Sequence, residues 1–484
     1  MTLPLSRLLP FQAVRLLLAL LLLTMLSGCQ VPKKEFSVRL ADLKQDSYNT
    51  ARISCFLALE NDIGPALRLN ISDIEVYTDG LWLPLIASPV NIASDLIGTG
   101  QIFLGGRAVP PGMYNQLRLT VNTGEVQDVD DNYESIISEP FDIEVPFTAA
   151  LKLAPGESRS FFITWNVKNS LRTGNNLKPA LTASPPISQL PLDLIFVTCP
   201  DIDTIFVISA ETNRIVDSFG VRGGPTHLAI DPDTSEQRLY VLTARDKMVK
   251  VVDLSTYRIL DLLPVPLNDE PTFMVISPDG QSAFLLDEHN GYLSRIDLTT
   301  DAMSSRVHLD YAPKYETFLV DQNLLAVSLS LAQKVILLDP LDLAIKGTIF
   351  TGSGPEGLVV YDNNLLIAEY GDNSVAFYDL MSRRVKSRQM VGFGPRRLLL
   401  TGDQIYVSNY QDGSLSILLQ DELGLIQEIS GLKSPKELVY DQSYFRLYVT
   451  DEKAAALAVI DVNSNLLLSY IPLGAEPFGL ALLQ

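Results

Sequence analysis

A proline that recurs every 40 to 46 residues constrains the fold of this chain more than any other feature. A second marker keeps the same phase: an apolar pair followed by Asp or Ser and a turn, as in Val251-Val252-Asp253 and Val459-Ile460-Asp461. The sixth unit, Ser416-Ile417-Leu418, lacks the Asp but keeps the phase. Two independent markers with one period over seven units predict that residues 191–484 are a repeat array. The prolines stand just before apolar runs, at Pro225, Pro271, Pro313, Pro355, Pro395, Pro435 and Pro477.

Each unit contains four short β-rich runs separated by turn residues. The third unit shows them at Thr272–Ser277, Ser282–Leu286, Tyr292–Leu298 and Ser305–Leu309, with the turn Pro278-Asp279-Gly280 after the first. Such runs, bounded by Gly, Pro and Asp, are typical of strands. Four strands in 40 to 46 residues indicate a blade of a β-propeller, because solenoid repeats of that length are helical.

The two ends of the array predict how the propeller closes. The first unit has only three strands, Leu194–Cys199, Thr204–Ser209 and Arg214–Phe219, and the last proline-led run, Phe478–Leu483, has nothing after it. If that last run pairs with the first three, it completes a seventh blade and removes the open sheet edges. We therefore predict a closed seven-bladed β-propeller.

Three segments give this region a family resemblance. Leu239-Tyr240-Val241-Leu242-Thr243, Ile405-Tyr406-Val407-Ser408-Asn409 and Leu447-Tyr448-Val449-Thr450-Asp451 resemble the Tyr-Val-Thr-Asn repeat of YVTN or YncE-like bacterial propellers. The Gly-Pro approaches at Gly224-Pro225 and Gly354-Pro355 also match. The resemblance covers residues 191–484 and implies the fold, whereas its function is poorly specified because the family includes diverse binding and uncharacterised envelope proteins.

Residues 36–182 lack the repeat and are predicted to form a separate β-sandwich domain. Val109-Pro110-Pro111-Gly112-Met113-Tyr114 and Asn176-Leu177-Lys178-Pro179 resemble an uncharacterised, prealbumin-like bacterial lipoprotein domain with no assigned activity. Residues 183–190, with Pro185-Pro186, are predicted to be a short stiff linker. The predicted strands are Phe36–Leu43, Ala51–Leu59, Leu67–Tyr77, Leu81–Ile86, Tyr114–Val121, Phe141–Val145 and Ser160–Val167.

The N-terminus has the layout of an export signal. Arg7 and Arg15 precede an apolar run from Leu16 to Leu26, which ends at Leu26-Ser27-Gly28-Cys29. This end resembles the bacterial lipobox, which implies a signal peptide over residues 1–28, lipidation of Cys29 and a tether over residues 29–35. Gln30 instead of Asp implies, by the same resemblance, sorting to the outer membrane of a Gram-negative cell, on a face that the sequence does not specify. An ordinary secretion signal with a chance cysteine is the alternative.

Charge and cysteine content limit the partners. The formal charge is −20, and the loss of Arg7 and Arg15 with the signal makes it −22. This charge disfavours nucleic acid and anionic lipid surfaces, so we expect the lipid to provide membrane attachment. Cys55 and Cys199 both lie in apolar runs and are predicted to be separate buried thiols.

The motifs of common catalytic and metal sites are not found in the sequence. The three histidines, His227, His289 and His308, lie in different units, and no zinc, haem, nucleotide-binding or serine-hydrolase motif is present. No cofactor is therefore predicted. One acidic stretch has oxygen ligands at calcium-loop spacing, although Tyr133 stands where the loop needs Gly, and a solvated hairpin loop is the stronger interpretation. Its candidate ligands are Asp128, Asp130, Asn132 and Glu139.

Connectivity predicts a binding rim at one mouth of the propeller channel. Residues just after each repeat proline and residues that close the second strand of each unit should meet there. Glu316, Asp287, Lys436, Glu437 and Glu452 occupy such positions. The rim is predicted from His227, Arg245, Glu288, Glu356, Glu369, Tyr370, Arg396, Arg397, Asn409, Tyr410 and Asp451.

Two classes of function fit these features. The first is a non-enzymatic lipoprotein whose propeller binds a protein, a glycan or a small ligand in the envelope. The second is a propeller enzyme, such as a metal-dependent lactonase or lyase, with Glu356, Glu369, Asn409, Asp451 and His227 around a cation. We favour binding, because the sequence contains no nucleophile–base or metal constellation and the arginines at 396 and 397 would oppose a cation.

Overall fold

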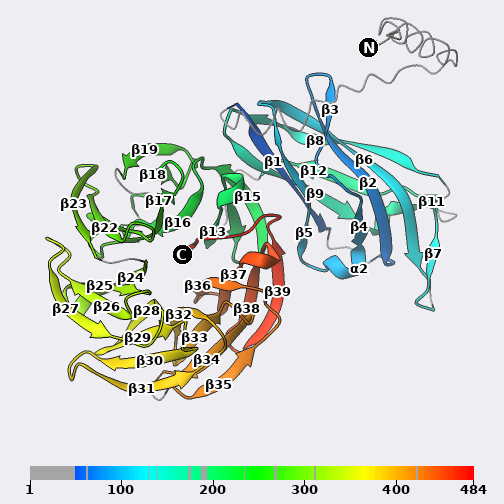
Figure 1. The fold of residues 1–484 in the computed structure, drawn as a ribbon. Coiled ribbons are helices and arrows are strands. Elements are labelled where there is room, and N and C mark those ends of the chain that lie inside the picture. Colours follow the sequence, from blue (N-terminus) through cyan, green and yellow to red (C-terminus); the bar gives the residue numbers. More distant parts are fainter. Residues whose placement is uncertain are drawn as a thin grey trace, which may run out of the picture. The chain divides into compact units, whose positions relative to one another are not determined.

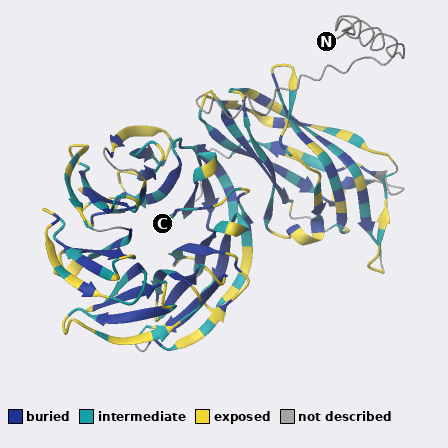
Figure 2. Cartoon of the chain, viewed as in Figure 1, coloured by how far each residue is buried: buried dark blue, intermediate teal, exposed yellow. Residues whose placement is uncertain are grey.

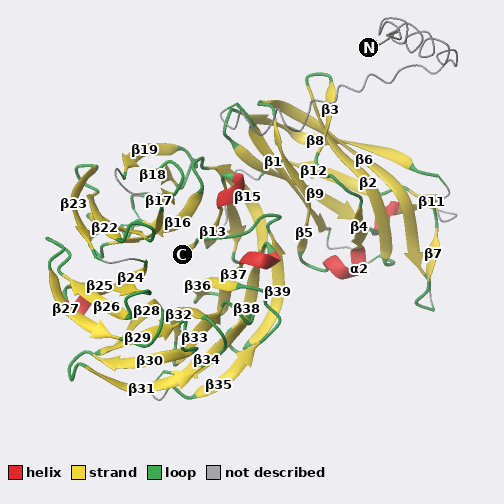
Figure 3. Cartoon of the chain, in the orientation of Figure 1, coloured by secondary structure: helices red, strands yellow, loops and turns green. Residues whose placement is uncertain are grey.

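The computed structural model describes residues 49–484, apart from 61–63, 129, 138, 173–175, 187–192, 234, 266–269, 310–311 and 421–422. The predicted signal peptide, Cys29, the tether and the strand Phe36–Leu43 lie outside these residues. Ser47–Gln484 form one compact unit. Nearly all of it is β-structure, as Figures 1 and 3 show. Among the described residues, no helix has the length and apolar character needed to cross a bilayer.

The C-terminal region is a seven-bladed propeller, which confirms the predicted fold class. Each of the seven blades is an antiparallel sheet of four strands. The blades are β40-β13-β14-β15, β16-β17-β18-β19, β20-β21-β22-β23, β24-β25-β26-β27, β28-β29-β30-β31, β32-β33-β34-β35 and β36-β37-β38-β39, from the inner to the outer strand. The strands are β13 (Leu194–Cys199), β14 (Thr204–Ser209), β15 (Arg214–Gly220), β16 (Pro225–Ile230), β17 (Arg238–Thr243), β18 (Met248–Asp253), β19 (Ile259–Pro264), β20 (Pro271–Ile276), β21 (Ser282–Asp287), β22 (Tyr292–Asp297), β23 (Ala302–His308), β24 (Pro313–Leu319), β25 (Leu324–Leu329), β26 (Lys334–Leu338), β27 (Ile345–Phe350), β28 (Pro355–Tyr361), β29 (Asn364–Glu369), β30 (Ser374–Asp379), β31 (Arg384–Met390), β32 (Pro395–Thr401), β33 (Gln404–Asn409), β34 (Ser414–Leu419), β35 (Leu425–Ile429), β36 (Pro435–Asp441), β37 (Arg446–Asp451), β38 (Ala456–Asp461), β39 (Leu466–Pro472) and β40 (Leu480–Leu483), with short 3₁₀ turns η2 (Pro200–Ile202), η3 (Val320–Gln322) and η4 (Glu452–Ala454).

The inner strands form a closed ring. Each inner strand from β16 to β36 contacts the next, and β40 contacts both β36 and β16. β40 also pairs with β13, from Leu194 opposite Leu483 to Val197 opposite Leu480. The predicted closure of the first blade by the end of the chain is confirmed. Proline suits the first residue of an inner strand, because that position needs no backbone N–H for the ladder.

The second sequence marker forms the turn between the third and fourth strands of a blade. The Asp253 carboxylate accepts the backbone N–H groups of Ser255 and Thr256, at 2.9 and 2.7 Å. Such side-chain bonds form a tight turn that ends in one left-handed residue. Every blade has that left-handed residue, at Asn213, Tyr257, Asp301, Leu343, Arg383, Leu423 and Asn465.

Apolar side chains between blades form the propeller core. Clusters join neighbouring sheets, as where Leu398 packs with Leu366 and Phe377 of the preceding blade. Figure 2 shows that the inner and middle strands are buried and the outer strands exposed, as for β31. Tyr448 adds a polar link, because its hydroxyl donates to Asn213 of the first blade at 2.7 Å. Tyr448 therefore joins the last full blade to the blade closed by β40.

The N-terminal domain confirms the predicted all-β class. Its ten-stranded sheet, ordered β3-β2-β6-β8-β12-β9-β1-β5 with β4 and β7 attached, nearly closes around a core that includes Trp165, Tyr114 and Phe161. Cys55 and Cys199 are buried free thiols, as predicted. The strands are β1 (Ala51–Leu59), β2 (Leu67–Thr78), β3 (Leu81–Pro84), β4 (Val90–Ala93), β5 (Gln101–Val109), β6 (Gly112–Gln127), β7 (Tyr133–Ser135), β8 (Phe141–Leu153), β9 (Ser158–Asn166), β10 (Leu171–Arg172), β11 (Asn176–Leu177) and β12 (Ala180–Ser184), with helices α2 (Ser94–Ile97) and η1 (Lys168–Ser170).

Hydrogen bonds connect the N-terminal domain to the first blade. The Oγ atoms of Ser160 and Ser218 are 2.9 Å apart, and Arg159 forms an ion pair with Asp217 at 3.0 Å. Phe56 packs in one apolar cluster with Phe206 of the propeller. β12 continues to Ser184, so residues 183 and 184 of the predicted linker lie in the sheet, and residues 187–190 lie outside the described residues.

Candidate functional site

One end of the propeller channel collects the starts of the inner strands and the ends of the second strands. The pairing of Pro225 with Thr243, Pro355 with Glu369 and Pro435 with Asp451 places both sets at the same end. We call this end the mouth. Each of the seven blades contributes the same backbone positions to the mouth, and the residue at a given position differs between blades.

The second residue after each repeat proline forms what we call the central ring. Two of its members are glycines at close backbone approaches. A Cβ on Gly357 would lie 2.6 Å from the Arg396 carbonyl oxygen, and one on Gly479 would lie 2.2 Å from that of Thr226. The ring comprises His227, Phe273, Tyr315, Gly357, Arg397, Glu437 and Gly479.

Three consecutive blades give the central ring an aromatic wall. The His227 and Phe273 ring centroids are 4.1 Å apart, and those of Phe273 and Tyr315 are 4.4 Å apart. Burial lowers the pKa of His227 to about 4, against an opposing effect of Glu437. The imidazole is therefore neutral at pH 7, and its Nδ1 is buried without a hydrogen-bond partner.

Arg397 fills the space between this wall and the acidic side of the ring. Its guanidinium lies 4.6 Å from the Tyr315 ring centroid, and its Nε donates to Glu437 at 2.9 Å. Its Nη1 is 3.7 Å from Glu356. Burial raises the pKa of Glu437, but Arg397, His227 and Lys436 outweigh it, so that the pKa lies below its usual value. The central ring is thus internally paired.

Arg396 forms a second cluster above the ring. Its guanidinium carbon lies 4.0 Å from the Tyr410 ring centroid and 5.8 Å from that of Tyr370, and its Nε is 3.2 Å from Glu356. Tyr410 donates to Glu452 at 3.2 Å. This cluster holds two tyrosines in fixed positions at the mouth.

A pocket of about 290 Å³ opens beside these groups. Arg245 and Phe478 line it, and Arg245 is held by an ion pair with Asp203 and a 3.2 Å bond to the Pro200 carbonyl. The pocket combines an aromatic ring with charged groups of both signs. Its lining also includes the carboxylates of Asp201, Glu270, Glu452 and Glu476.

Three residues of the predicted rim are completely buried. Glu369, Asn409 and Asp451 each end a second strand and are 0% exposed. Glu369 accepts from the Gly352 N–H at 2.6 Å and from Arg388 at 2.9 Å. Asp451 accepts the N–H groups at positions 433 and 434, both at 2.8 Å. Glu369 and Asp451 hold the loops between blades, and Asn409 donates to Ser414 and Ser416 of its own blade. The groups of the predicted rim that meet at the mouth are therefore His227, Arg245, Glu288, Glu356, Tyr370, Arg396, Arg397 and Tyr410.

Glu288 also lies at the mouth, where it forms an ion pair with Lys314. It accepts from Lys314 at 2.5 Å and lines a hollow of about 380 Å³ with His289. The pair neutralises both charges in the half-buried rim.

The structure adds Phe273, Tyr315 and Phe478 to the predicted set. Their positions relative to the repeat proline are those of His227 and Arg396 in other blades. A comparison of each repeat position across all blades that included apolar as well as polar side chains would have identified these three residues.

Glu316 departs from the repeat pattern. It is 1% exposed and occupies the position that Leu228, Leu358 and Leu398 fill in other blades. Neither carboxyl oxygen has a hydrogen-bond partner. Burial raises its pKa well above the usual value, against a smaller opposing effect of the Val275 backbone. Burial therefore favours the protonated acid at this position.

Within the described residues, no three His, Cys, Asp or Glu side chains are grouped so as to hold a metal ion. In the acidic stretch, Asp128 accepts the backbone N–H groups of Asp130 and Asn132 at 2.8 and 2.9 Å. Glu139 lines a separate hollow of the N-terminal domain. The described part of the stretch therefore forms a hydrogen-bonded turn.

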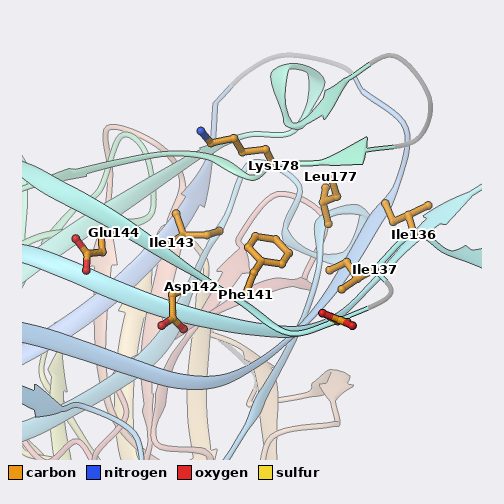
Figure 4. Close-up of a pocket in the computed structure, with 9 residues that line it drawn as sticks. Ile136, Ile137, Phe141, Asp142, Ile143, Glu144, Leu177 and Lys178 are labelled. Atoms are coloured by element: carbon orange, nitrogen blue, oxygen red, sulfur yellow. The ribbon is translucent and has the colours of Figure 1, made fainter.

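That hollow, of about 440 Å³, is larger than the mouth pocket. In Figure 4, Phe141, Ile137 and Leu177 face one another across it. These lining side chains are apolar, and Lys178 extends from its upper edge. The mouth is the stronger functional site, because it combines aromatic, cationic and anionic groups from several blades.

Comparisons with known proteins show the propeller fold alone. No family model and no curated protein matches the chain. A functionally unknown protein from Desulfotomaculum acetoxidans DSM 771 aligns with a TM-score of 0.53 at 14% identity, over 60% of this chain and 99% of its own. Kuenenia stuttgartiensis hydrazine synthase has a TM-score of 0.48 at 16% identity, over 53% and 89% of the two chains. Dihydro-heme d1 dehydrogenase NirN in complex with DHE has a TM-score of 0.46 at 14% identity, over 59% and 67%.

Proposed function

We propose that this chain is an exported lipoprotein, anchored in the outer membrane through Cys29, whose propeller mouth binds an envelope protein, a glycan or a small ligand without catalysis. The lipobox resemblance at Leu26-Ser27-Gly28-Cys29 supports the anchor. An N-terminal acyl chain and a diacylglycerol on the cysteine would bury enough CH₂ groups for stable attachment.

The observation that carries the binding role is the Tyr370–Arg396–Tyr410 cluster beside the pocket at Phe478. Rigid aromatic side chains lose little entropy on binding, and paired charges are already oriented for polar contacts. The residues come from three blades of a closed ring, so the scaffold fixes their spacing. A concave site that combines an aromatic side chain with a few polar groups is suited to ligand recognition.

Two experiments test the parts of this proposal separately. Cys29→Ser should release the protein from the membrane fraction and abolish incorporation of radiolabelled palmitate, and retention of both would reject the anchor. Phe478→Ala should abolish co-purification of the bound partner from gently solubilised membranes. Phe445→Ala is the matched control, because Phe445 is 49% exposed and stands just before β37, the second strand of its blade, at the end away from the mouth.

A further inference from the structure

Arg396 and Lys436 lie in neighbouring blades at the same position of the repeat. Each directly follows the proline that begins its inner strand, β32 or β36. These two strands contact each other, and the charge of Arg396 acts on that of Lys436. A guanidinium and an ammonium group, which only donate hydrogen bonds, are therefore brought to one part of the mouth.

Neither side chain has a hydrogen-bond acceptor of its own. Among the described residues, none accepts a hydrogen bond from the guanidinium of Arg396 or from the ammonium of Lys436. The Nε of Arg396 lies 3.2 Å from Glu356, yet it is buried without a hydrogen-bond partner. Lys436 is 7% exposed, and no carboxylate in the described part of the chain reaches ion-pair distance of its Nζ. Buried donors without acceptors are rare, and a bound ion is one of their explanations.

Aromatic rings hold both cations in place. The Arg396 guanidinium carbon is 4.0 Å from the Tyr410 ring centroid, and the Lys436 Nζ is 3.0 Å from that of Phe478. An aromatic face attracts a cation without accepting a directed hydrogen bond from each N–H group, so the donors stay available to a ligand. The carboxylate of Glu452 is engaged by the Tyr410 hydroxyl, at 3.2 Å.

The charges of three neighbouring inner strands leave one cation without a counterion. Arg397 donates to Glu437 at 2.9 Å. Arg396 lies beside Glu356, so Lys436 is left without a carboxylate of its own on these strands. Burial lowers the pKa of Lys436 to about 7, against opposing effects of which Glu437 has the largest, so the ammonium form is costly here. One negative charge beside it would balance β28, β32 and β36, which favours a monoanionic carboxylate over a doubly charged phosphate.

We propose that Arg396 and Lys436 bind a carboxylate group of the ligand at the mouth. The inference rests on the proposed binding role and adds the chemical class of the group that is recognised. A guanidinium forms paired hydrogen bonds with the two oxygens of a carboxylate, and an ammonium group adds a compact charge with rotatable donors. Because Tyr410 and Phe478 flank the two cations, an aromatic acid is a suitable probe.

The test is the fluorine NMR linewidth of 4-fluorobenzoate in the presence of the full chain in detergent at pH 6.5. We expect the signal to broaden, whereas the neutral 4-fluorobenzamide, which has nearly the same shape, should stay sharp. 4-Fluorophenyl phosphate should bind no more tightly than the benzoate. Equal linewidths for the acid and the amide with the folded wild type would overturn the proposal, and tighter binding of the phosphate would overturn the choice of a carboxylate.

Lys436→Gln and Arg396→Gln each remove one charge and keep a polar side chain. Each should weaken the binding of 4-fluorobenzoate at least about tenfold, the loss expected for one charge-assisted hydrogen bond. Lys433→Gln is the matched control, because Lys433 is exposed, precedes β36 and changes the net charge by the same amount. Equal weakening by all three variants would show a general effect of charge and would overturn the site.

A competition experiment identifies the source of the carboxylate. Displacement of 4-fluorobenzoate by N-acetylglutamate amide would support an acidic side chain of a protein partner, and benzoate binding that this compound does not affect would support a free organic acid. A partner that co-purifies with a wild type that does not bind the benzoate would reject the carboxylate and leave the proposed function intact. Benzoate binding without any co-purified partner would reject only the partner.

Discussion

The two ends of the propeller blades follow opposite rules. At the end with the turns between third and fourth strands, every blade has one left-handed residue, and an Asp such as Asp253 or Asp297 accepts the turn amides in most of them. At the mouth, the same position in successive blades holds His227, Phe273 or Arg397. The repeated end specifies the fold, and the variable end provides the chemistry. Changes to shared structural elements should affect stability, and changes at the mouth should affect binding.

The largest effect is expected from removal of residues 477–484. The deletion removes β40, so β13 loses its inner partner and the ring of inner strands opens between β36 and β16. We expect the propeller to lose its cooperative thermal transition in calorimetry. An unchanged transition would show that the blades do not need closure.

The next largest effect is expected from Arg397→Met. It leaves Glu437 buried without its paired cation, whereas Glu356 keeps Arg396, and breaking a buried pair on one side typically costs about 3–5 kcal/mol. The free energy of unfolding from urea titration measures this. Adding Glu437→Leu should recover part of the loss, and a double variant weaker than the single one would contradict the pairing.

Glu316→Leu should stabilise the protein by about 1–3 kcal/mol at pH 8, because it replaces an unpartnered buried carboxyl with the leucine of the other blades. The folded-state pKa is raised, so the folded protein retains a proton that the unfolded chain releases. The stability that the acid form provides is present below the unfolded pKa and is lost as pH rises. The gain from the variant should therefore be small at pH 4 and grow towards pH 8.

The matched control is Leu358→Glu, which places a carboxyl at the same position of the next blade. It should destabilise the protein, and the loss should increase as pH rises. If the urea midpoint of each variant is the same at pH 4 and pH 8, the two positions do not bury a carboxyl in the same apolar environment.

The smallest effect is expected from Tyr448→Phe, at the end with the repeated turns. The loss of its hydroxyl bonds to Asn213 and the Ala210 carbonyl should cost about 1 kcal/mol. Tyr240→Phe is the control, because the hydroxyl of Tyr240 is bonded to Asp231 within its own blade. If only the control lowers the melting temperature, the link between blades contributes nothing.

The repeat made the propeller predictable, since the prolines and the turn marker locate the inner strands and the turns in each blade. The burial of Glu369, Asn409 and Asp451 was not predictable from chain position, because strand alternation and the next loop decide where a side chain points. In the N-terminal domain, β5 with Gly105-Gly106 gave no strand signal, and the parallel pairing of β1 with β9 joins distant segments. Local pattern cannot specify such a pairing.

The measurement that tests the central claim most directly is quantitative co-purification from gently solubilised membranes, with wild type, Phe478→Ala and Phe445→Ala compared at equal thermal stability. A mouth that carries the function predicts that wild type and Phe445→Ala retain the same bound partner, while Phe478→Ala loses it. Equal retention by all three proteins would contradict binding at the mouth.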